Sequence, residues 1–128
     1  MNKLWVWGAA LVAAGVLAAC GGGGDSNGYG AVAASVSTKK VAISAKALTQ
    51  SGANDEARDA CDASDCKIIL QFEECGAAAQ GITSTGALLF AAGAGDTAFD
   101  AQTAANAACT TAGGTACGQV PNLEAKCN

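Results

Sequence analysis

Apolar and small residues recur along the first half of the chain with the two-residue period of β-strands. Residues 30–35 and 41–48 alternate apolar with small or polar positions, and the polar stretch between them has the composition of a turn. An aliphatic run within residues 66–72 is typical of a buried strand. This part of the sequence therefore predicts three short strands.

Between the second and third of these strands, alanine recurs with helical spacing. Residues 53, 57, 60 and 61 share one face of a helix that Ser51 or Asn54 could cap and that runs to about residue 63. Asp55 and Glu56 would then lie in the first turn, where the helix dipole favours acidic side chains. The predicted order of the first half is β-β-α-β.

The second half repeats this order. It predicts strands over 77–82 and 87–92, then a helix over about 97–112 that ends at two glycines. A last strand is expected near 118–126, where Pro121 either confines it to a sheet edge or breaks it. Two β-β-α-β units predict the α+β class, with a small antiparallel sheet that carries both helices on one face.

The first 19 residues have the pattern of a bacterial lipoprotein signal peptide. Lys3 is their one charged residue, and residues 4–19 form an apolar run that is short for a membrane-spanning helix. Leu17-Ala18-Ala19-Cys20 resembles a lipobox, in which the chain is cut before the cysteine and a lipid is attached to its thiol. We expect lipidation of Cys20; an unlipidated secretory signal and a retained membrane helix are the alternatives.

The glycine-rich residues 20–28 predict a tether between this anchor and a folded domain. Acyl chains on Cys20 would hold the protein at a membrane. Gly21 favours the outer membrane, because an aspartate at that position retains lipoproteins in the inner membrane of well-studied bacteria. We therefore expect an envelope protein whose domain lies in the periplasm or at the surface.

The cysteines indicate an internal duplication. Apart from Cys20 they form two triplets, Cys61, Cys66 and Cys75, then Cys109, Cys117 and Cys127. The residues before the first cysteine of each triplet align at an offset of 48, where Ala53, Ala57 and Ala60 meet Ala101, Ala105 and Ala108. We expect one duplicated domain over residues 29–128, with halves of about 29–75 and 76–128.

Six cysteines in an exported chain predict three disulfide bonds. One pairing that respects the duplication joins Cys61–Cys66 and Cys109–Cys117 within the halves and Cys75–Cys127 between them. A symmetric alternative pairs Cys66–Cys75, Cys117–Cys127 and Cys61–Cys109, and the sequence does not choose. Large apolar side chains are few, so the core is thin and disulfides are needed to stabilise it.

The net charge limits the classes of partner that the protein can bind. Loss of Lys3 with the signal peptide leaves six basic against eleven acidic residues, a net charge of −5. Such a chain has no basic stripe for phosphates, so we expect no nucleic-acid partner.

Several segments resemble a known bacterial family of exported proteins, catalogued as domain of unknown function 4189. The resemblance covers roughly residues 29–127 and is carried by an aromatic-Gly-Ala start, an alanine-rich helix that ends in Cys, a Cys-Lys-aliphatic strand and a Cys-small-small-Ala segment. In this sequence these are residues 29–33, 57–61, 65–69 and 72–78. The chain departs from many members in the polar loop 110–115 and in lacking Trp after residue 19. The resemblance implies no activity, cofactor or catalytic residue.

The sequence contains few residues that could form a known type of catalytic site. The chain has no His, which excludes Ser-His-Asp triads and Cys-His dyads. Ser44 and Lys46 would share one face of a regular strand, but solvated strand residues explain them. Glu73 and Glu74 would point to opposite faces, and Asp55, Asp59 and Asp62 would form an exposed acidic stripe on a helix. We expect no enzyme, metal or cofactor.

By elimination, the sequence predicts a lipid-anchored envelope protein whose domain binds another macromolecule. Its partners would be the membrane, through the lipid on Cys20, and an envelope or secreted protein. One alternative is a periplasmic inhibitor or immunity protein against a wall-degrading enzyme or toxin, since lysozyme-like enzymes are commonly basic and an acidic surface complements them. A structural envelope lipoprotein is the other.

Overall fold

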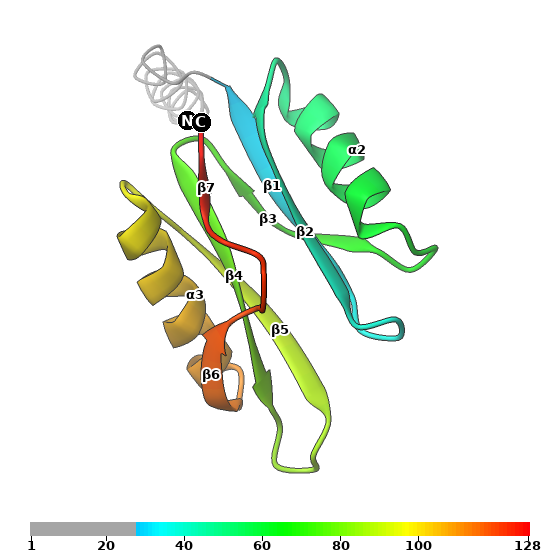
Figure 1. The fold of residues 1–128 in the computed structure, drawn as a ribbon, viewed down its shortest axis with the longest axis vertical. Helices are drawn as coiled ribbons and strands as arrows, with labels where there is room; N and C mark the ends of the chain where they lie inside the picture. The colour runs from blue at the N-terminus through cyan, green and yellow to red at the C-terminus, as the bar shows by residue number, and fades with distance from the viewer. Residues whose placement is uncertain (1–27) are drawn as a thin grey trace, which may run out of the picture.

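The computed structural model describes residues 28–128, so the predicted signal peptide, Cys20 and the tether up to residue 27 lie outside the described range. The elements, in chain order, are β1 (Tyr29–Ser35), β2 (Lys40–Ala47), α2 (Gln50–Cys61), β3 (Lys67–Phe72), β4 (Cys75–Ile82), β5 (Leu88–Gly95), α3 (Ala98–Thr111), β6 (Thr115–Gln119) and β7 (Lys126–Cys127) (Figure 1). The predicted α+β class and the repeated β-β-α-β order are confirmed.

The strands form two antiparallel sheets, one from each half. The first has the order β2-β1-β3, and the second has the order β5-β4-β6 with β7 paired to the start of β4. Helix α2 lies on the outer side of the first sheet and α3 on the outer side of the second, so the layers run helix, sheet, sheet, helix (Figure 1). The expectation of one sheet with both helices on one face is corrected in this respect.

The reason is that both faces of each sheet are apolar. Alternate residues of β1 separate its two faces, with Ala31 and Ala33 toward α2 and Val32 toward the second sheet. The inner face of the first sheet has to be covered, and the second sheet covers it. This inter-sheet core contains Val32, Ile43, Phe72 and Ala78, with Leu70, Ala92, Val120 and Leu123 packed around them.

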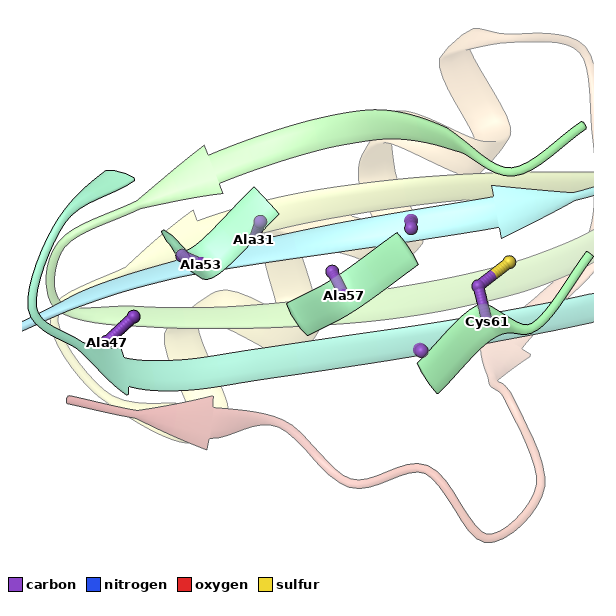
Figure 2. Close-up of a cluster of buried hydrophobic side chains, with 7 residues drawn as sticks. Ala31, Ala47, Ala53, Ala57 and Cys61 are labelled. Atoms are coloured by element: carbon purple, nitrogen blue, oxygen red, sulfur yellow. The ribbon is translucent and has the colours of Figure 1, made fainter. Parts of the chain in front are cut away.

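Alanine dominates the two outer cores. Figure 2 shows Ala53 and Ala57 of α2 over Ala31 of β1, with Cys61 at the helix end. The second half has the same arrangement, in which Ala101, Ala105 and Cys109 pack on Ala77 and Ala79. Because these side chains are short, helix and sheet approach closely, and dispersion between nearby atoms partly replaces the burial of bulky groups.

Helix α2 begins earlier than the sequence predicted. Its N-cap is Thr49, whose hydroxyl accepts a hydrogen bond from the Gly52 amide at 2.9 Å, instead of Ser51 or Asn54. Asp55 and Glu56 therefore lie beyond the first turn. Helix α3 is capped in the same way by Thr97, where the predicted helix is expected to begin. The N-cap threonine and the helix cysteine are equally far apart in the two halves, as Thr49 and Cys61 in one and Thr97 and Cys109 in the other.

The predicted last strand is two pieces. β6 ends at Gln119 and β7 begins at Lys126, with Pro121 in the break. Pro lacks an amide donor and cannot continue a sheet ladder. Between the two strands, Val120 and Leu123 turn inward to the inter-sheet core.

A β-bulge distinguishes β2 from its counterpart β5. Tyr29 pairs with Ala47 and Ala31 with Ser44, so β2 has one extra residue opposite Gly30. Lys46 lies in this bulge, with φ of 64°. The register of β4 on β5 is regular. Ser44 and Gly93 are therefore equivalent, at an offset of 49, and the constant offset of 48 applies only after the bulge.

Candidate functional site

An open cleft of about 500 Å³ lies beside the turn between β3 and β4. It is lined by residues 71–75 on one side and by residues 94–96, where β5 leads into α3, on the other. Phe72, which is 4% exposed, is the largest apolar side chain in this lining. The polar part of the lining is mainly acidic, with carboxyl groups on Glu73, Glu74 and Asp96.

Glu74 and Asp96 meet in this cleft. Their side chains share a hydrogen bond, which raises the pKa of Glu74, and the negative charge of Asp96 raises it further. Two carboxyl groups can share such a bond only when one of them holds a proton. This pair could not be found from the sequence, because the residues are 22 positions apart and only the fold brings them together.

Asn128 holds the end of the chain against the same turn. Its amide donates to Glu74 O at 2.8 Å, and its Nδ2 donates to Glu73 O at 3.0 Å. Its Oδ1 accepts a hydrogen bond from the Lys46 amide in the β2 bulge. With the disulfide Cys75–Cys127 alongside, these contacts connect the two halves at one end of the molecule.

The predicted acidic stripe of Asp55, Asp59 and Asp62 lies along the outer side of α2, with Asp62 just past the helix as its C-cap. These three side chains and that of Glu56 are exposed. Asp55 Oδ1 lies 3.5 Å from Arg58 Nη1, and Asp62 Oδ2 lies 3.7 Å from Lys40 Nζ. Glu56 and Asp59 take part in neither pair. This face of the domain presents a surplus of negative charge to solvent.

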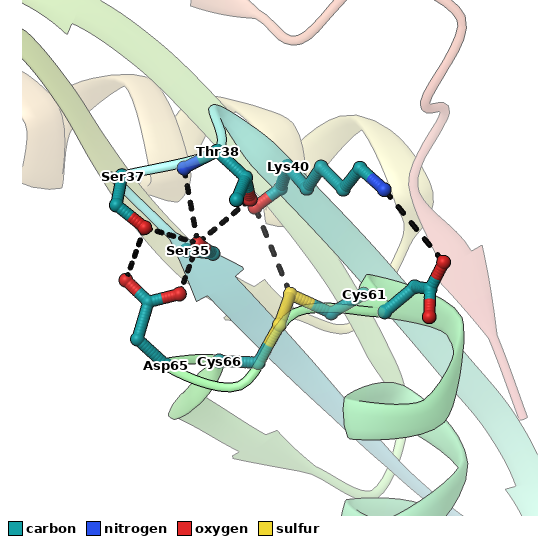
Figure 3. The surroundings of a disulfide bond; sticks show 8 residues. Ser35, Ser37, Thr38, Lys40, Cys61, Asp65 and Cys66 are labelled. Atoms are coloured by element: carbon teal, nitrogen blue, oxygen red, sulfur yellow. Dashed lines mark hydrogen bonds and ion pairs between the residues drawn. A yellow bond between two sulfur atoms is a disulfide. The ribbon is translucent and has the colours of Figure 1, made fainter.

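The carboxylate of Asp65 holds the loop that the Cys61–Cys66 disulfide closes (Figure 3). Ser35 donates to Asp65 Oδ1 at 2.5 Å, and Ser37 donates to Oδ2 at 2.7 Å. The Thr38 hydroxyl donates to Ser35 Oγ at 2.8 Å. The hydrogen bond from Ser35 makes the largest contribution to lowering the pKa of Asp65, and the hydrogen bond from Ser37 makes the next largest. These hydrogen bonds join the β1–β2 turn to the disulfide loop, so the role of Asp65 is to stabilise the fold.

The other residues considered from the sequence are separated by the fold. Ser44 donates to Ala53 O at 2.7 Å, beneath α2, whereas the bulge leaves Lys46 exposed. They do not form a Ser-Lys pair. Glu73 and Glu74 lie in a turn and not on a strand, so the expected assignment of opposite strand faces does not apply.

The disulfides are Cys61–Cys66, Cys75–Cys127 and Cys109–Cys117, the first of the two pairings considered. Cys20 lies outside the described residues. Within residues 28–128, no three or more potential metal ligands gather in one place. In the same range no helix has the length and apolar character needed to cross a bilayer.

Comparison with known proteins gives a family and no activity. No curated protein matches the chain, and no solved structure matches it. A family model with the description "Domain of unknown function (DUF4189)" matches residues 29–123, which include all the helices and strands that the structure describes except β7. Because that match covers most of its length, the chain belongs to the family of this domain of unknown function.

Proposed function

We propose that this chain is a lipid-anchored protein of the bacterial cell envelope whose domain binds another protein and catalyses no reaction. The lipobox ending at Cys20 supports the anchor, and the export that it implies is consistent with a domain that uses all its remaining cysteines in disulfides.

The observation that carries the binding proposal is the exposed acidic face of α2. Two of its carboxylates, on Glu56 and Asp59, lie outside the ion pairs that engage Asp55 and Asp62. The corresponding face of α3 has one acid, Asp100. Surface charge of one sign accelerates the encounter with a partner of the opposite sign.

The partner that this charge favours is a basic protein that reaches the envelope. Wall-degrading enzymes of the lysozyme type are commonly basic, so inhibition of such an enzyme is the specific form of the proposal. An immunity protein against a basic toxin would use the same surface. Both would be guarding functions performed at the membrane surface.

Binding to a purified basic lysozyme tests the proposal. The mature, lipidated protein, reconstituted in vesicles, is titrated with the enzyme at low and at physiological salt, and both binding and the rate of wall hydrolysis are measured. The variant Glu56→Gln/Asp59→Asn removes two charges from α2. The control Asp100→Asn/Glu124→Gln removes two exposed acids elsewhere.

Binding that weakens with salt and with the α2 variant, but not with the control, is the expected result. Equal loss in both variants would show that only net charge matters. If the wild-type protein does not bind the lysozyme, and a deletion strain shows a general permeability defect instead of sensitivity to one enzyme, a structural envelope role replaces the proposal.

A further inference from the structure

Two large apolar side chains are exposed where the two helices begin. Leu48 is 94% exposed and immediately precedes the N-cap of α2, while Phe99 is 78% exposed and lies in the first turn of α3. These are the most exposed large apolar residues among residues 28–128. Both helices start at the same end of the molecule, where β1 begins and β7 ends (Figure 1).

A chain of contacts runs across this end. Gly28 lies so close to β2 that a Cβ on it would come within 2.8 Å of Lys46 Cα, two residues before Leu48. The Lys46 amide donates a hydrogen bond to Asn128, and the Asn128 amide donates one to Glu74 O. Glu74 lines the same cleft as Asp96, which lies three residues before Phe99. The point where the described chain begins is therefore beside the end of β2, just before Leu48, and at the same end of the domain as the start of α3.

The covalent chain limits how far this end can be from an anchor at Cys20. Eight residue steps separate Cys20 from Gly28, and a fully extended chain covers at most about 3.6 Å per residue, or about 29 Å in all. This step rests on the proposed lipid anchor. If Cys20 is in the bilayer, the end with Leu48 is held within about 29 Å of the lipid.

We propose that this end of the domain rests on the bilayer, with Leu48 and Phe99 inserted into the boundary between headgroups and acyl chains. Exposed apolar side chains at such a boundary gain by leaving water. The acidic face of α2, which starts at this end and runs along the side of the domain, would then remain open to a soluble partner.

Charge at this end does not drive the contact. Lys46 and Lys126 lie there with four acidic side chains, Glu73, Glu74, Asp96 and Asp100, so acidic groups outnumber basic ones. Anionic lipids would gain little from the two cations and would be repelled by the acidic groups. The contact should therefore form on zwitterionic phosphatidylcholine and should not need anionic lipid.

Single tryptophans provide the measurement, because Trp5 and Trp7 are the only tryptophans of the chain and both lie in the predicted signal peptide. The variants are Leu48→Trp and Phe99→Trp, with Val36→Trp as the matched control. Val36 is also an exposed apolar residue, 57% exposed, but it lies in the β1–β2 turn at the far end. Each processed lipoprotein is reconstituted in phosphatidylcholine vesicles with and without brominated acyl chains.

We expect the fluorescence of Leu48→Trp and Phe99→Trp to shift to shorter wavelength and to lose most of its intensity with brominated lipid, whereas Val36→Trp changes little. Equal quenching of all three variants, or no quenching of Leu48→Trp and Phe99→Trp in vesicle-bound protein, overturns the inference. A wavelength shift that depends on protein concentration, without quenching, indicates a second copy and also overturns it.

Failure of the anchor gives a different result. One such result is an intact mass showing that the signal peptide, with Trp5 and Trp7, has not been removed; another is protein that fails to float with the vesicles. In either case lipid anchoring itself is wrong, and both the proposed function and this inference fail. If it floats with the vesicles but the two tryptophans are not quenched, only the inference fails.

Discussion

The two halves share one order of elements but bring their helices to the sheet differently. In the first half, Ser44 lies beneath α2 and its hydroxyl donates to Ala53 O. At the equivalent position of the second half, Gly93 lies so close to α3 that an added Cβ would overlap the Ala105 amide nitrogen. The same fold is thus closed by a hydrogen bond in one half and by direct backbone contact in the other.

The inner faces of the sheets differ as well. The first sheet supplies large side chains, such as Val32, Ile43 and Phe72, whereas the second supplies Ala78 and Ala92. Two bulky faces would hold the sheets apart, and two alanine faces would leave little area to bury. The two halves are therefore complementary, with the large side chains of one filling the space that the small side chains of the other leave.

The largest expected effect tests that complementarity. The Phe72 ring occupies the space where a Cβ on either Gly30 or Gly76 would lie, so neither of these two neighbours has a side chain that could fill its place. Phe72→Ala should lower the free energy of unfolding by about 5 kcal/mol, the upper end for such a truncation. Phe99→Ala makes the same chemical change at an exposed site and should be nearly neutral. Denaturant titration measures both, and similar losses would contradict this account of the core.

Removing the disulfides one at a time distinguishes the cross-link between the halves from the cross-links within each half. Cys75–Cys127 closes a loop with a sequence separation of 52, against 5 for Cys61–Cys66 and 8 for Cys109–Cys117. Loop-closure entropy predicts a loss of about 4 kcal/mol without the first bond and about 2 kcal/mol without either of the others. Thermal unfolding of the three Cys-to-Ala double variants measures this order. Equal losses would mean that the inter-half bond has no special weight.

The contact between helix and sheet provides the next comparison. Gly93→Ala forces α3 away from β5 and should cost about 2–3 kcal/mol, as overpacking does. Ser44→Ala removes one hydrogen bond and leaves the Ala53 carbonyl in its helix, so about 1 kcal/mol is expected. Urea unfolding of the two variants decides the matter; a larger loss for Ser44→Ala would reverse the comparison.

The smallest expected effect is on pH dependence, where two carboxyls act with opposite sign. The lowered pKa of Asp65 means that its contribution to stability is present above its ordinary value of 3.8 and is lost as pH falls through the folded-state pKa. The raised pKa of Glu74 means that its contribution is present below 4.5 and is lost as pH rises through the folded-state value.

Asp65→Asn should therefore flatten the loss of stability at low pH, and Glu74→Gln should flatten the loss that accompanies rising pH above 4.5. Unfolding midpoints measured across this acid range, with the exposed Glu124→Gln as control, test both slopes. Unchanged slopes in both variants would show that neither hydrogen bond persists in solution.

The sequence predicted the class, the repeated order and most element boundaries because alternation, alanine spacing and cysteine spacing are local signals. It did not predict two sheets, because that depends on which face of each strand is covered, and alanine is compatible with either. Thr49 was overlooked as the cap in favour of Ser51 and Asn54, which are also good capping residues. The meeting of Glu74 with Asp96 depends on strand register, which the Lys46 bulge shows can shift by one residue.

The position of Phe72 also bears on how the molecule loses its structure. The ring belongs to the first half and is enclosed by glycines from both halves, so neither half retains a complete interior when the other opens. Although its two halves repeat one order of elements, the domain should melt in one cooperative step, with equal calorimetric and van't Hoff enthalpies. Slowly exchanging amides should then be found in both sheets together, with a common opening free energy.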